Sequence, residues 1–131
     1  MTQQESIKIW VDGSADATDT AQRLFKSKKF NHSLFFLHLA LEKILKAVFI
    51  NKFDSAPPYT HDLVILAEKC QLDISNDQKS QLSEISEFNV SARYEDYKYR
   101  MYKKATEVYT TQWFKIAADL LDIFNKEIKD E

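Results

Sequence analysis

The chain of 131 residues has one cysteine, one glycine and two prolines. A lone cysteine excludes a disulfide framework and a cysteine-based metal site. So few glycines and prolines leave little material for the tight turns that join many short strands. Residues of good helix propensity dominate, and hydrophobic residues at 44% with charged ones at 29% are typical of globular proteins. We therefore expect an all-α fold, with residues 1–131 forming one domain that buries a real core.

Excess charge of one sign and long apolar runs are scarce as well. The net charge of −2 does not indicate a protein that binds nucleic acid through its overall charge. Leu34–Ile50 is the longest apolar stretch, but it is slightly too short to span a membrane and charged residues interrupt it. The polar N-terminus and the short apolar run Ile7–Val11 do not make a signal peptide. We expect a cytoplasmic protein with no membrane partner.

Helical spacing of apolar residues predicts five helices. In chain order they cover about 14–28, about 31–52, a segment that Thr60 would cap, a segment that a capping box at 75–78 would open, and about 104–129. Residues 89–100 show no apolar period and are expected to form a loop or an irregular helix entry. Short connections between helices predict an up-and-down antiparallel bundle of five helices. The second helix is apolar nearly all round, which places it at the centre.

A polar row interrupts that central helix. His38, Glu42 and Lys46 follow one another at i, i+4 and i+8, with Lys43 beside them. Ionisable side chains are rarely buried unless they are paired. We expect the row to face a cleft or a subunit interface, where the side chains bind one another, Arg93 and Tyr94, or a nucleotide. The alternative is a Glu42–Lys46 surface pair with His38 capping the core.

Thr60-His61-Asp62-Leu63 is the second candidate site. An imidazole beside the free amide groups of a helix start suits an anion such as phosphate. The alternative is a loop histidine that hydrogen-bonds to the backbone. No second His or Cys stands near enough to make a metal motif, so we expect neither a metal nor another cofactor.

The third candidate is the sequence ARYEDYKYRMYKK, in which residues 93–104 carry five basic and two acidic side chains. Guanidinium groups bind phosphates in bidentate fashion, and tyrosine rings stack on bases. In this interpretation Arg93 and Lys46 contact phosphate, Tyr94 or Tyr97 stacks on a base, and His61 orients the phosphate. The alternative is a solvated connection that packs on the bundle. No Gly-rich phosphate loop and no local catalytic motif is present, so no residue is assigned a catalytic role.

Four features follow one another along the chain: an early Trp10, then FLHLALEKILKAVFI, PPYTHDLVIL and ARYEDY. Together they resemble the HEPN domain, a helical module named for nucleotide binding. The most specific parts are Glu42-Lys43-x-x-Lys46-Ala47, His61-Asp62-Leu63 and Ala92-Arg93-Tyr94. The resemblance implies a five-helix bundle that usually forms a homodimer. It also implies a minimal nucleotidyltransferase as a partner, in some cases within a toxin–antitoxin pair.

Many HEPN proteins are metal-independent ribonucleases with an Arg-x4–6-His motif, and this chain departs from it. Neither Arg93 nor Arg100 is followed by a histidine at that offset. We therefore expect a non-catalytic module that binds a nucleotide or nucleic acid such as RNA. One alternative is a ribonuclease that uses His61 or His38 for proton transfer. Another is a purely structural dimeric adaptor.

Overall fold

A computed structural model describes residues 1–129, apart from the side chains of Ser91 and Arg93. Within that part the chain forms six helices and no strand: α1 (Gln3–Lys26), α2 (Phe30–Phe53), α3 (Leu63–Lys69), α4 (Asn76–Arg93), α5 (Glu95–Lys104) and α6 (Glu107–Lys126). The all-α prediction is confirmed, and the count of five helices was wrong. Among the described helices, none has the length and apolar character needed to cross a membrane.

The additional helix is α5, which covers half of the segment expected to be a loop or an irregular helix entry, and α4 extends over residues 89–93 of the same segment. Met101 is its one buried residue, and the other nine side chains are exposed. A helix with a single buried position produces no apolar period in the sequence. This is why periodicity could not reveal it.

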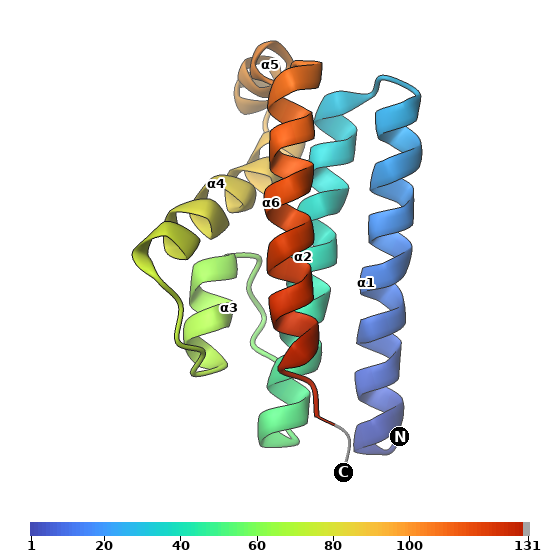
Figure 1. Cartoon of the computed structure of the whole chain (residues 1–131), viewed down its shortest axis with the longest axis vertical. Coiled ribbons are helices and arrows are strands. Elements are labelled where there is room, and N and C mark those ends of the chain that lie inside the picture. Colours follow the sequence, from blue (N-terminus) through green and yellow to red (C-terminus); the bar gives the residue numbers. More distant parts are fainter. Residues whose placement is uncertain (130–131) are drawn as a thin grey trace.

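Helix α2 is the centre of the fold, as its apolar surface predicts. It packs against each of the five other helices. Figure 1 shows α1, α2 and α6 running along the long axis, with α3 and α4 on one flank and α5 at one end. Burial on all sides explains why α2 has no polar face of the kind that surface helices show.

Side-chain caps set most of the helix starts. Ser75 and Gln78 form the predicted capping box of α4. Thr2 begins α1 in the same way, about a dozen residues before the expected start. The predicted cap Thr60 was wrong for α3, because the carboxylate of Asp62 accepts hydrogen bonds from the backbone amides of Val64 and Ile65 at 2.9 and 3.2 Å.

The single glycine is not used where helices usually need one. Gly13 lies inside α1, whereas Lys28, Asp54 and Gln71 adopt left-handed backbone angles with φ of 61°, 47° and 58°. Lys28 and Gln71 follow the ends of α1 and α3, and the next amide in each case reaches back five residues to a carbonyl, at 2.8 and 3.2 Å. Each such non-glycine residue costs roughly 1 kcal/mol or more.

Replacing Gly13 by alanine should stabilise the protein. Alanine is the better helix former by about 0.8–1.0 kcal/mol. A Cβ at this position would lie 3.1 Å from Cδ of Lys43, which is part of a flexible, half-buried side chain that can shift. We expect Gly13→Ala to raise the free energy of unfolding by roughly 0.5 kcal/mol in urea titrations.

The matched control is Ala15→Gly on the exposed side of the same helix, which should lower stability by about 1 kcal/mol. A loss of stability in Gly13→Ala would contradict the prediction. It would show that the stem of Lys43 is held in place against α1.

Candidate functional site

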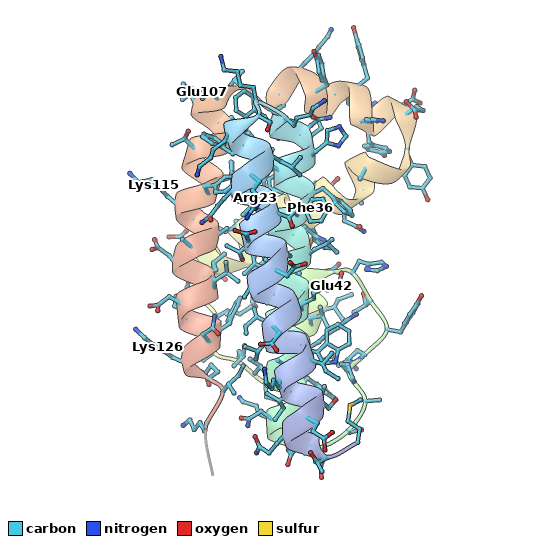
Figure 2. The ribbon with its side chains drawn as sticks, turned by 90° about the vertical axis from the view of Figure 1, so that its right-hand side faces the viewer. Arg23, Phe36, Glu42, Glu107, Lys115 and Lys126 are labelled. Carbon is cyan, nitrogen blue, oxygen red and sulfur yellow. The ribbon has the colours of Figure 1, made fainter. Side chains whose placement is uncertain are left out.

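The polar row of α2 is buried. His38, Glu42 and Lys46 expose 0%, 5% and 7% of their surface, and Figure 2 labels Glu42 about midway along α2, beside α1. The i, i+4 spacing stacks the three side chains on one side of the helix. Because charges buried to this degree must be compensated, their partners define the site.

Glu42 is the centre of this buried cluster. Its Oε1 accepts a hydrogen bond from Nδ1 of His61 at 2.8 Å, and its Oε2 accepts one from Nζ of Lys46 at 3.1 Å. Nε2 of His38 lies 3.8 Å from the same Oε1. Two candidate sites that are separate in the sequence, the polar row and the His61 motif, are therefore one cluster in the fold.

The charge of Glu42 is maintained despite its burial. Burial by itself raises the pKa of this carboxyl, but the hydrogen bond from His61 and the charge and hydrogen bond of Lys46 outweigh it. The net pKa is lower than its ordinary value of 4.5. At neutral pH the cluster therefore contains a carboxylate, which stabilises the ammonium of Lys46.

His61 connects the buried cluster to the surface. Its backbone carbonyl accepts a hydrogen bond of 2.8 Å from Nε2 of His38, so this segment is attached to α2 twice. The His61 side chain is 37% exposed and lines a cleft of about 410 Å³ between the start of α3 and α4. Since Nδ1 donates to Glu42, the Nε2 atom is the one that can act toward a ligand.

Lys46 and Lys43 both turn toward α1. Nζ of Lys46 lies 5.4 Å from the ring centroid of Trp10, a cation–π contact in addition to its bond with Glu42. Lys43 is half-buried and lies across Gly13. The contact with Trp10 was not foreseen, because helical spacing carries no information about residues that lie on different helices.

The tyrosines of the third candidate site lie elsewhere, around α5 at one end of the bundle (Figure 1). Tyr94 and Tyr97 are 60% and 43% exposed, and their rings meet edge to face at 6.2 Å. Arg100 stacks over Tyr97 at 5.3 Å from the ring centroid. The side chain of Arg93, the main phosphate contact expected from the sequence, lies outside the described residues.

A polar cluster that the sequence did not reveal holds α5 in place. Glu84 of α4 accepts hydrogen bonds from Lys104 at 2.6 Å and from the hydroxyl of Tyr109. Burial raises the pKa of Glu84, but these two partners outweigh it and lower the net value. Burial and the adjacent Glu84 carboxylate raise the pKa of Tyr109. These contacts connect α4, the end of α5 and the start of α6. Their partners are 20 and 25 residues apart in the sequence, so no local motif predicts them.

The described side chains provide no cluster of metal ligands. Among them no three His, Cys, Asp or Glu residues gather closely enough to hold a metal ion. Cys70 is buried, and its thiol donates to the carbonyl of Leu45 at 3.3 Å. Burial raises its pKa to about 11, so the sulfur is a thiol at neutral pH rather than a reactive thiolate.

Removing the charge of Glu42 should destabilise the fold strongly. Glu42→Gln leaves the ammonium of Lys46 buried without its counter-charge, which typically costs roughly 3–5 kcal/mol. The pKa of Glu42 is lowered in the folded state, so its contribution is complete above about pH 4.5 and is lost as pH falls toward the folded-state value. Urea titrations at pH 7 and at points down to pH 3 measure the free energy of unfolding. This energy should fall less on acidification in Glu42→Gln than in the wild type.

Glu68→Gln is the control, since Glu68 is an exposed carboxylate on α3. It should change stability by no more than about 0.5 kcal/mol. If Glu42→Gln proved as mild as Glu68→Gln at pH 7, the buried cluster would not have the structural role assigned to it.

Comparison with known proteins agrees with this architecture. Residues 7–128 match the HEPN domain family. The crystal structure of TT1696 from Thermus thermophilus has a similar fold, with a TM-score of 0.78 and 15% sequence identity over 92% of this chain and 97% of that one. No curated protein matches the sequence. Because the family match extends over nearly the whole chain, the protein belongs to the HEPN domain family.

Proposed function

We propose that the protein is a non-catalytic HEPN module that binds a nucleotide or single-stranded nucleic acid through the exposed side of α5. The observation that carries this proposal is a concentration of exposed rings. Of the six exposed aromatic side chains in the described part, four lie between Tyr94 and Tyr102, and the other two are Phe53 and Tyr59. Single exposed aromatic residues are common, whereas a cluster of them indicates a binding surface.

Positive charge accompanies these rings. Arg100 lies over Tyr97, and Lys103 lies over Tyr99 at 4.6 Å from the ring centroid. The spacings of i+3 and i+4 allow each cation to reach a ring on the same helix. Bases stack on aromatic rings, and cations attract the phosphates between bases. A surface built this way suits a nucleic acid strand without demanding one sequence.

The sequence-based candidates take different parts in the proposal. Tyr94 and Tyr97 are stacking residues together with Tyr99, and Arg93 is a phosphate contact. Lys46 is assigned to the buried cluster, because its ammonium already binds Glu42 and faces Trp10. HEPN membership supports the further expectations of a homodimer and a minimal nucleotidyltransferase partner. A cytoplasmic location completes the proposal.

The α5 surface can be tested by fluorescence anisotropy with a short labelled single-stranded RNA. Tyr99→Ala should weaken binding by about tenfold, since one stacked base contributes roughly 1–3 kcal/mol. Lys103→Gln should weaken binding and reduce the slope of log K against log salt by about 0.7. Arg93→Glu should weaken it as well.

Tyr59→Ala provides the matched control. Tyr59 is 97% exposed but stands before α3, away from α5, so its loss should leave the affinity unchanged. Equal affinity in wild type and Tyr99→Ala would rule out the α5 surface. A dimer that binds neither RNA nor nucleotide would instead support the structural adaptor.

A second candidate function, metal-independent RNA cleavage, rests on the pair of Glu42 and His61. A carboxylate that holds Nδ1 of an imidazole leaves Nε2 free to act as a proton donor or acceptor toward a substrate. The cleft lined by His61 gives a substrate access to this atom.

Incubation of RNA with the purified protein and EDTA separates the two functions. The non-catalytic proposal predicts intact RNA with wild type and with His61→Ala alike. Cleavage by the wild type that disappears in His61→Ala, while Lys115→Gln at an exposed position of α6 stays active, would establish the ribonuclease in its place.

A further inference from the structure

A cavity of about 330 Å³ lies below α5 and is separate from the cleft at His61. It opens to solvent and is bordered by the first two turns of α2, the last two turns of α4, and α5. This volume is at the lower end of the range of about 300–1,000 Å³ found for ligand pockets, so it suits a small molecule. The buried cluster of Glu42 does not contribute to its walls.

The walls of this cavity favour a flat ring. Phe88 and Met101 are its most buried apolar residues, with 2% and 6% of their surface exposed. Phe35 and Phe36 complete the apolar wall and are only half-buried, and their rings are perpendicular with centroids 5.4 Å apart. A planar guest that stacks on one of these rings therefore meets the edge of the other, and both arrangements are favourable between aromatic groups.

The polar rim of the cavity favours a negative charge. Of the four basic residues of α5, Lys104 is paired with Glu84, and Arg100 and Lys103 lie over tyrosine rings. Lys98, which lines the cavity, takes part in no ion pair or ring contact with the described side chains. Lys98 is thus the cation of α5 that can bind an anion in the cavity.

The start of α2 adds to this preference. Asn31 and His32 of its first turn line the cavity, and the capping residue Lys29 makes no side-chain hydrogen bond to that turn. The amide groups of an uncapped helix start attract anions. Lys98 and this turn belong to different helices and border the same cavity.

We propose that the cavity binds one nucleobase between its aromatic walls, with the attached phosphate held by Lys98 and the first turn of α2. The ligand class is a nucleoside monophosphate, either free or as one nucleotide of a strand. This inference rests on the proposed function and gives it a specific pocket beside the α5 surface. Free nucleotide and strand share the same chemistry, so the experiment has to separate them.

Calorimetric titration of the full-length protein with AMP, GMP, CMP and UMP tests the pocket, with adenosine and inorganic phosphate as partial ligands. We expect a bound nucleotide to lose about tenfold in affinity in Phe36→Leu, which keeps apolar volume but removes the ring. Lys98→Gln should weaken the nucleotide by a similar factor and leave the nucleoside unaffected. Lys98 is exposed, so this variant will fold even if Phe36→Leu does not.

Two control variants match these changes. Phe53→Leu alters a partly exposed ring at the other end of α2, and Lys115→Gln removes a cation of α6 that Figure 2 shows on the opposite side of α1 from Phe36. Neither should change nucleotide binding. RNA binding by the same variants shows whether a strand also places a base in the pocket.

The outcomes distinguish this inference from the proposed function. Nucleotide affinity that is equal in wild type and Lys98→Gln would overturn the pocket. The pocket would also be overturned if no nucleotide bound and Phe36→Leu left RNA binding unchanged. In that case, weaker RNA binding by Tyr99→Ala would still support the α5 surface. If neither nucleotide nor RNA binds, both proposals fail.

Discussion

The carboxylate of Glu42 is buried and accepts two hydrogen bonds, one from Lys46 on its own helix and one from His61 at the entry to α3. An unpaired charge at this depth would be strongly unfavourable, so the arrangement is stable only when both partners are in place. His38 adds a second bond to the same segment through the carbonyl of His61. The entry to α3 is therefore attached to α2 through Glu42 and His38, and α4 packs in turn on both α2 and α3.

The sequence identified the members of this cluster as candidate residues but did not show that His61 contacts the residues of α2. The i, i+4 spacing of His38, Glu42 and Lys46 is visible because it arises within one helix. His61 is 19 residues from Glu42, beyond the proline turn, and the two meet only because the chain folds back over α2. Periodicity describes one element at a time, and contacts between elements depend on the path of the chain. Trp10 was missed as a partner of Lys46 for the same reason.

Helix α5 shows the opposite case, since its chemistry was recognised from the sequence and its structure was not. The interleaved tyrosines and cations stood out by composition, but a helix that buries only Met101 has no apolar period to detect. Its position depends instead on Lys104 and Tyr109, which bind Glu84 across 20 and 25 residues. Because these polar contacts and Met101 anchor α5, its remaining side chains are left exposed to solvent.

The two polar regions differ in what a ligand would have to disturb. A phosphate that recruited Lys46 would separate it from Glu42 and leave a buried carboxylate short of a partner, which opposes binding by roughly 3–5 kcal/mol. The cations of α5 are already exposed to solvent, and stacking on tyrosine rings orients Arg100 and Lys103 at little cost. Lys98 borders an apolar cavity and has no competing partner among the described side chains. The energetics therefore favour ligand binding at α5, while the more strongly interacting charges of α2 serve the fold.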